Sequence, residues 1–266
     1  MSDSTMKKIT LVHLYPKEMN IYGDLGNVIT LKNRTTWRGI EFVTKEVNLG
    51  DTTSLPQGDI YFMGGGQDND MYKVFEDLKR KKTEVLDLVN ANKVFLLICG
   101  GFQLFGDYFL DANMREMKGL GILPVVTKAP GTELKHRCLG NLVGKLTPEI
   151  ITTINKYYPG NKSEFLVGFE NHSGQTFFTD DRAKETANVV VGSGNNSTDR
   201  KEGASYKNIF ASYMHGSLLP KNPHFADMLI GKALFNKYPN SNSLISLDDS
   251  IEWLAHNAIL KKMNIN

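Results

Sequence analysis

Short apolar runs alternate with segments of helical periodicity over the first hundred residues. Four runs have the length and composition of strands: residues 8–15, 41–47, 59–66 and 93–98. Between them, residues 25–37 and 71–90 carry apolar side chains at spacings of three and four, which is typical of amphipathic helices. The fourth run is apolar from Val94 onward, as expected when helices cover both faces of a parallel sheet. The pattern predicts an α/β fold with a single doubly wound, largely parallel sheet and flanking helices.

The second half of the chain is richer in strand-like segments. Five of them are separated by turn residues: 137–146, 164–170, 175–178, 187–192 and 207–216. The polar stretch 192–205 is expected to be an exposed loop, and residues 223–238 and 247–263 are expected to be helical. No repeat or long linker divides the chain. We therefore expect one domain over residues 1–266, with a core over about 7–220 and C-terminal helices over about 221–264.

Composition and charge exclude several classes of protein. The 266 residues carry 31 basic and 29 acidic side chains, a formal net charge of +2 that gives no support for nucleic-acid binding. No apolar run approaches the roughly 20 residues that span a bilayer, and the apolar stretch before Pro16 is too short for a signal peptide. Two cysteines do not make a disulfide framework. We expect a cytoplasmic protein that is not embedded in a membrane.

Cys99 lies between an apolar strand and two glycines, in the stretch "LLICGGFQLFG". A helix beginning at Gly100 would direct its free amide groups toward the sulfur, and a thiolate so placed is a nucleophile. Cysteine is also a small apolar residue that often lies in cores, so the stretch by itself leaves both interpretations open. Phe102, Phe105 and Phe109 follow at helical spacing and are expected to anchor that helix to the sheet.

A histidine and a second glycine cluster lie at the ends of other predicted strands. His215 closes the strand 207–216 and is the candidate base for a thiol nucleophile. Gly64, Gly65 and Gly66 follow the strand that begins at residue 59, and three functions are open for them: a phosphate cradle, an oxyanion hole or a simple turn. No phosphate-binding motif continues the glycines. No spacing of Cys, His or carboxylate residues indicates a metal site.

Several motifs resemble the class I glutamine amidotransferases. "CGGFQ" matches that class's C-x-G-x-Q elbow through Cys99, Gly101 and Gln103. "ICGGFQLFG", "GFENHSG" and "IFASYMHG" are similar to the branch that contains cobyric acid synthase (CobB/CobQ). Within that branch, "LYPKEMNIYGDLGN", "FMGGGQD" and "GNNSTDRKEGASYKNIFASYMHG" resemble the glutaminase subunits of lipid II isoglutaminyl synthases. The resemblance covers about residues 7–220.

The resemblance implies a role for each candidate residue. Cys99 would attack the side-chain amide of L-glutamine to form a γ-glutamyl thioester, and His215 would move the protons. The oxyanion hole would be formed by backbone amides of one loop and the elbow: Gly64, Gly65, Gly66 and Gly100. Gln103 would help to hold the substrate. Arg137, in "HRCLGN", would bind the α-carboxylate, since a guanidinium can bond both carboxylate oxygens.

The resemblance also implies a partner. The ammonia would pass to a Mur-ligase-like subunit, MurT, which would use ATP and Mg to amidate the D-glutamate α-carboxylate of lipid II. This chain carries no ATP-binding motif, and we expect no cofactor or metal in it. The alternatives are a glutaminase for another acceptor such as a corrinoid carboxylate, a catalytically silent scaffold subunit and a thiol peptidase. Intact Cys99 and His215 argue against a silent scaffold.

Two positions depart from the pattern of the class. Leu97 stands where a glycine usually precedes the nucleophile by two residues. The usual triad ends in His-x-Glu, whereas this chain has Ser217 two residues after His215, so a Cys–His dyad or a distant carboxylate is expected. Cys138 is expected to be structural, and the stretch "NIYGDLGN" is expected to line the crevice or the partner surface.

Overall fold

A parallel sheet forms the centre of the structure, a computed structural model that describes residues 6–111, 115–130, 137–158, 160–241 and 244–265. Its six strands lie in the order β13 (Ala204–Tyr206), β14 (Ile209–Ser212), β4 (Val94–Ile98), β3 (Ile60–Met63), β1 (Lys8–Leu14) and β2 (Glu41–Val47). All neighbouring pairs are parallel except the β13–β14 hairpin. The predicted fold class, a largely parallel sheet with flanking helices, is therefore confirmed.

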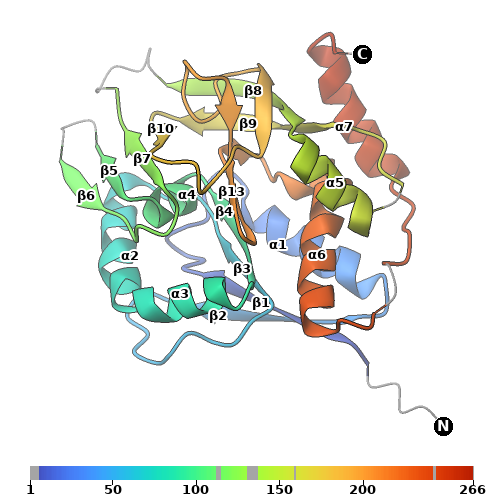
Figure 1. Ribbon diagram of the computed structural model, residues 1–266, viewed down its shortest axis with the longest axis horizontal. Helices are drawn as coiled ribbons and strands as arrows, with labels where there is room; N and C mark the ends of the chain where they lie inside the picture. The colour runs from blue at the N-terminus through green and yellow to red at the C-terminus, as the bar shows by residue number, and fades with distance from the viewer. Residues whose placement is uncertain (1–5, 112–114, 131–136, 159, 242–243, 266) are drawn as a thin grey trace.

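Helices cover both faces of this sheet. Helices α1 (Leu25–Thr36) and α6 (Pro223–Lys237) lie on one side, and α2 (Asp68–Arg80) and α3 (Lys82–Asn90) lie on the other (Figure 1). The prediction of one continuous helix over residues 71–90 is wrong, because two helices, α2 and α3, cover this region. The chain leaves helical geometry at Lys81, whose Nζ donates back to Asp77 at 2.8 Å and to the Asp51 carbonyl at 2.8 Å. The lysine is buried by this turn, which separates α2 from α3.

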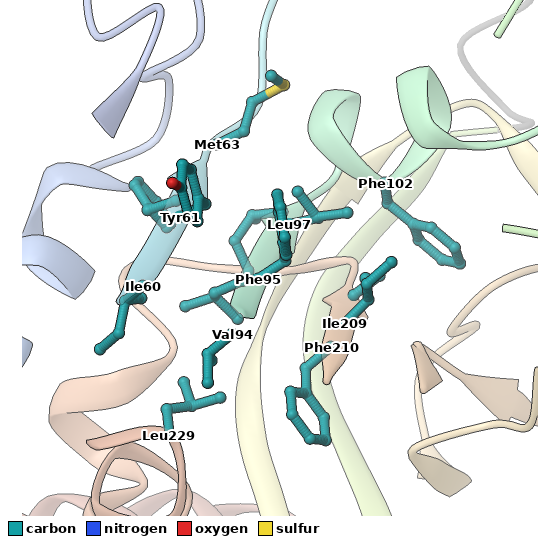
Figure 2. Packing of buried hydrophobic residues seen from close by; sticks show 14 of the residues in the cluster. Ile60, Tyr61, Met63, Val94, Phe95, Leu97, Phe102, Ile209, Phe210 and Leu229 are labelled. Carbon is teal, nitrogen blue, oxygen red and sulfur yellow. The ribbon is translucent and has the colours of Figure 1, made fainter. Parts of the chain in front are cut away.

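The apolar core lies on the two faces of strands β3, β4 and β14. Ile60 and Val94 point toward Leu229 of α6 (Figure 2). On the opposite face Tyr61 stacks on Phe95, with their ring centroids 4.9 Å apart. Both faces are buried, so these strands read as continuous apolar runs, and each large side chain removed from water contributes roughly 1.5–3 kcal/mol.

Two further sheets are formed by strands that follow Cys99 in the chain. One has the order β12 (Lys201–Glu202), β11 (Ala187–Val191), β8 (Cys138–Leu146), β9 (Phe165–His172) and β15 (Met214–His215). The other has the order β10 (Gln175–Phe178), β7 (Val125–Lys128), β5 (Tyr108–Leu110) and β6 (Glu116–Lys118). Helices α5 (Pro148–Tyr157) and α7 (Ser250–Lys262) complete the regular elements described in this part of the chain, with a 3-10 turn over Leu219–Lys221. Strand β15 pairs with β9 directly after β14, which ties His215 to the antiparallel sheet.

The stretch 192–205 is not the exposed loop that its polarity predicts. It contains β12 and the start of β13, and Asn195 and Asn196 are completely buried within it. The Asn195 side chain accepts from the Gly203 amide at 2.7 Å and donates to the Gly203 carbonyl at 2.8 Å. Buried polar groups are tolerated when they are hydrogen-bonded, and these amides act as substitutes for backbone partners. None of the described helices is long and apolar enough to cross a membrane.

A buried charge network joins α1 to the C-terminal helices. The Arg34 guanidinium donates to both carboxylate oxygens of Asp227, at 2.7 and 2.9 Å, and to Asp249 at 2.5 and 3.0 Å. Arg34 is 1% exposed, and Arg38 adds a second guanidinium to Asp227. The guanidinium groups supply the counter-charge that two carboxylates taken out of water require.

Replacing Arg34 by methionine is therefore expected to lower the free energy of unfolding by about 3–5 kcal/mol, because Asp249 and part of Asp227 lose their counter-charge inside the protein. Urea unfolding followed by circular dichroism measures the change. Arg182→Met is the matched control, since its ion pair with Asp180 is solvent-exposed and screened by water, so its loss should leave the free energy of unfolding nearly unchanged. Equal stability of the two variants would contradict the assigned role of the network.

Candidate active site

Cys99 occupies a strained turn between β4 and the short helix α4 (Gly100–Phe105). Its backbone has φ +51° and ψ −101°, a conformation that non-glycine residues rarely adopt. The turn is held by hydrogen bonds from the Cys99 amide to the Ser212 carbonyl at 2.9 Å and from the Gln103 amide to the Cys99 carbonyl at 3.0 Å. A Cβ at Gly101 would lie 2.8 Å from the Met63 carbonyl oxygen, so the turn requires glycine there. The strand–turn–helix predicted around this cysteine is present.

The aromatic repeat after Cys99 was only partly predicted. Phe102 and Phe105 are fully buried on α4, as expected. Phe109 is not on that helix, because the chain becomes extended at Gly106 and continues into β5. The side chain of Phe109 instead lines the pocket above Cys99. The helix is short because the backbone at Gly106 packs directly against Val125 at the start of β7.

His215 is held by a carboxylate that the sequence did not identify. Its Nδ1 is hydrogen-bonded to Oδ1 of Asp24 at 3.0 Å, and both side chains are completely buried. The Nε2 atom of His215 has no hydrogen-bond acceptor or donor among the described residues, which leaves it for the thiol. Asp24 lies in the stretch "NIYGDLGN", between β1 and α1. The available signal was its position after the carboxyl end of β1, the edge where β3 and β4 also end.

The charge of His215 depends on its two neighbours. Burial by itself lowers the pKa of His215, but the Cys99 thiolate and the hydrogen bond to Asp24 raise it, to about 10. The imidazole is therefore protonated near neutral pH whenever Cys99 is a thiolate. An imidazolium beside a thiolate is the pair that a thiol nucleophile needs: one group attacks and the other holds the proton for the leaving group.

Ser217 stands where the class usually has a glutamate, and its surroundings explain the difference. The Ser217 hydroxyl donates to the Gly23 carbonyl at 2.5 Å, and a Cβ at Gly26 would collide with the same hydroxyl. The side chain is thus directed at the start of α1, with φ +45° at its own backbone. A larger side chain would displace α1. The carboxylate reaches the imidazole from Asp24, the residue directly before that helix.

The triple glycine contributes one amide to Asp24 rather than to the pocket. The Gly65 N–H donates to Oδ2 of Asp24 at 2.7 Å, and the Gly64 carbonyl accepts from the Gly101 amide at 3.1 Å. Gly66 lies beside the elbow, where a Cβ on Gly100 would be 3.0 Å from the Gly66 nitrogen. Gly66 and Cys99 both line the pocket. Of the predicted oxyanion donors, Gly66 and Gly100 are therefore neighbours at the elbow, and Gly66 lines the pocket together with Cys99.

Gly65 is in contact with both catalytic candidates, which makes it a sensitive position. A Cβ there would lie 2.8 Å from Cε1 of His215 and 3.1 Å from Ile21, closer than real Cβ contacts. Gly65→Ala is expected to lower kcat/KM for glutamine hydrolysis by about 100-fold, because the added methyl group pushes the imidazole away from Cys99. Steady-state ammonia release measures it. Gly160→Ala, where a Cβ meets nothing within 4 Å, is the control; unchanged activity in Gly65→Ala would refute this geometry.

The pocket over Cys99 has a volume of about 490 Å³, within the range of small-molecule sites. Gln103 and Arg137, both predicted as substrate-binding residues, line it together with Cys99. Arg137 is held from two sides: its Nε donates to Asn171 at 2.5 Å and its Nη2 donates to the Tyr22 hydroxyl at 3.0 Å. Tyr22 also makes an edge contact with His215, at 5.1 Å between ring centroids.

Gln103 is fixed by a buried network rather than free in the pocket. Its side-chain amide donates to the Tyr213 hydroxyl at 3.1 Å, and that hydroxyl bonds to Thr176 at 2.5 Å. Tyr213 in turn stacks on His172, at 3.9 Å between centroids. Among the described residues no group of three His, Cys, Asp or Glu side chains forms a metal site. Cys138 and Cys99 are both free thiols. Cys138 is buried, and its sulfur accepts a hydrogen bond from Gln175 Nε2 at 3.3 Å.

Comparison with known proteins identifies the family of this chain. Residues 10–223 match the CobB/CobQ-like glutamine amidotransferase domain. The chain is 35% identical to the lipid II isoglutaminyl synthase (glutamine-hydrolyzing) subunit GatD of Streptococcus pneumoniae, over 91% of this chain and 86% of that protein. It is 32% identical to GatD of Staphylococcus aureus, over 87% of each chain. A cobyric acid synthase of Caldanaerobacter subterraneus is 25% identical over 80% of this chain but only 39% of that longer protein.

A solved structure supports the fold. A crystal structure of a glutamine amidotransferase aligns over 84% of this chain and 98% of its own, with a TM-score of 0.53 at 14% identity. That likeness concerns the backbone arrangement alone. The match over residues 10–223 and the identity to two full-length relatives decide the family: this chain belongs to the CobB/CobQ-like glutamine amidotransferases.

Proposed function

We propose that this protein is a glutaminase that releases ammonia from L-glutamine for a ligase subunit bound to it. The observation that carries the proposal is the series Cys99, His215 and Asp24, in which Cys99 lines a pocket that also contains Arg137 and the other two side chains are buried behind it. A strained elbow, a buried base with one free nitrogen and a buried carboxylate are the parts of a thiol triad. A silent scaffold would have no use for a buried, charge-coupled histidine.

The reaction begins with transfer of the Cys99 proton to Nε2 of His215. The sulfur then attacks the side-chain amide carbon of glutamine, and the negative oxygen is stabilised by the amides of Gly66 and Gly100. The imidazolium gives its proton to the departing nitrogen, which leaves as ammonia. A γ-glutamyl thioester remains on Cys99. A water molecule, deprotonated by His215, then hydrolyses the thioester to glutamate. Asp24 keeps the imidazole oriented through Nδ1 and stabilises its positive charge.

The acceptor is proposed from the relatives. Both GatD proteins are named as subunits of lipid II isoglutaminyl synthase, so we propose that this chain pairs with a Mur-ligase-like subunit, MurT, that amidates the D-glutamate of lipid II with ATP. The work would take place in the cytoplasm, where that subunit finds its ATP. The second candidate is a corrinoid carboxylate acceptor, favoured by the identity to a cobyric acid synthase, which is however much longer than this chain.

The test is to measure ammonia and glutamate released from L-glutamine by the purified chain, alone and with a co-expressed Mur-ligase-like subunit. Equal amounts of the two products are expected. Added hydroxylamine should intercept the thioester as γ-glutamyl hydroxamate, which a simple water-activating hydrolase would not form. Amidated lipid II should appear only when the ligase subunit and ATP are present. No ammonia from folded protein in either arrangement would exclude the glutaminase.

A further inference from the structure

Two opposite charges lie on the wall of the catalytic pocket, apart from the sulfur and the imidazole. Arg137 belongs to the segment that leads into β8, and Asp68 is the first residue of α2. Both line the same pocket as Cys99. The two side chains are near enough for Arg137 to lower the pKa of Asp68, against the stronger raising effects of burial and of Asp111.

Arg137 keeps donor capacity for a ligand. Its Nε and Nη2 groups are held by Asn171 and Tyr22, so the guanidinium is fixed in orientation. Five N–H groups are available on a guanidinium, and these two contacts leave the others for a carboxylate in the pocket. The fixed fork thus fits the α-carboxylate of an amino acid.

Asp68, unlike Arg137, is not held by side-chain hydrogen bonds among the described residues. Among the described residues its carboxylate makes no hydrogen bond and no ion pair, and it is exposed to the open pocket. Asp70, two residues further along α2, instead bonds to Lys73 at 3.0 Å on the outer surface of α2. An exposed carboxylate on the pocket lining, near a fixed guanidinium and without a hydrogen-bond partner among the described residues, is suited to bind a cation.

We propose that Asp68 binds the α-ammonium group of the substrate, so that Asp68 and Arg137 together select an α-amino acid by both of its charges. The inference rests on the proposed function, because it concerns the substrate of the same site. A zwitterion whose ammonium and carboxylate are held by Asp68 and Arg137 can extend its side-chain amide toward Cys99 in the same pocket. Asp68 then determines specificity against amides of the same length that lack the α-ammonium, such as glutaramate (4-carbamoylbutanoate).

The experiment measures binding rather than turnover, so that it does not depend on hydrolysis. The protein carrying Cys99→Ala is titrated with L-glutamine and with glutaramate, with and without Asp68→Asn. Asp68→Asn is expected to raise the Kd of L-glutamine about 10- to 100-fold, the usual effect of one charge-assisted hydrogen bond, and to leave the Kd of glutaramate unchanged. Asp70→Asn is the control and should change neither.

The outcomes separate this inference from the proposed function. Equal Kd values for L-glutamine with and without Asp68→Asn would overturn it, as would an equal rise for both ligands, which would indicate a general distortion of the pocket. Suppose that binding follows the expected pattern but the protein that retains Cys99 releases no ammonia. This result would support the amino-acid site and refute the glutaminase. Thermal unfolding of each variant identifies any that fail to fold, and Asp68→Glu, which keeps the charge, should then restore preference for L-glutamine.

Discussion

Replacing Cys99 with alanine is expected to lower kcat for ammonia release from L-glutamine by a factor of about 10⁴ or more, because no other group on the pocket wall can form the thioester. Cys99 directly follows β4 and lines the pocket together with Gly66. Alanine keeps the Cβ and meets the same positive φ, so the backbone strain of the elbow is unchanged. The loss therefore measures the chemistry of the sulfur.

The second free cysteine provides a matched control. Cys138 is 4% exposed, against 7% for Cys99, so Cys138→Ala removes a thiol of similar burial from a different sheet. Its kcat should stay within about twofold of the unsubstituted protein. Steady-state ammonia release and hydroxamate trapping are measured for both variants. Residual activity in Cys99→Ala near the starting level would mean that the thiol is part of the core and not the nucleophile.

Asp24→Asn is expected to reduce kcat by about 10³-fold, somewhat less than the roughly 10⁴-fold known for the matching change in a serine protease. Asp24 accepts two hydrogen bonds, from His215 Nδ1 and from the Gly65 amide. An asparagine has one acceptor oxygen and one donor nitrogen at these positions, so it cannot accept both. Either the imidazole takes the wrong tautomer or the glycine loop loses its anchor. Asp59→Asn, at a buried aspartate that directly precedes β3 and so lies at the far end of the strands from the site, is the control and should retain activity.

The same variant should change the pH dependence. The pKa of His215 is raised to about 10, so the imidazolium that protonates the leaving group persists until the pH passes that value. Without Asp24 the alkaline limb of the kcat/KM profile moves to lower pH. A raised histidine pKa contributes stability that is complete below about 6.5 and lost as the pH rises through about 10. The difference in unfolding free energy between the unsubstituted protein and Asp24→Asn should therefore shrink as the pH rises from about 6.5 to about 10. An alkaline limb that does not shift in Asp24→Asn would argue against the Asp24–His215 bond.

The strands and their carboxyl ends were predictable because burial on two faces leaves a clear trace in the sequence. Residues 93–98 could hardly be anything but a buried strand, and Cys99 followed from where that strand ends. Asp24 was not predictable in the same way, because its partner His215 is 191 residues away and no local spacing connects them. The burial of Asn195 was missed for a related reason: a polar stretch looks exposed unless the backbone groups that pair with its amides are known.

The Asp24 carboxylate is hydrogen-bonded both to His215 and to the glycine loop that contains Gly65. Oδ1 of Asp24 is bound to the imidazole and Oδ2 is bound to the Gly65 amide, so a displacement of the glycine loop is transmitted to His215. The nitrogen chemical shifts of isotope-labelled His215 would then report the position of the glycine loop. Nuclear magnetic resonance can measure them in protein without substrate. Docking of a second subunit, or of a small inhibitor, could be followed through that one signal even where neither touches the histidine.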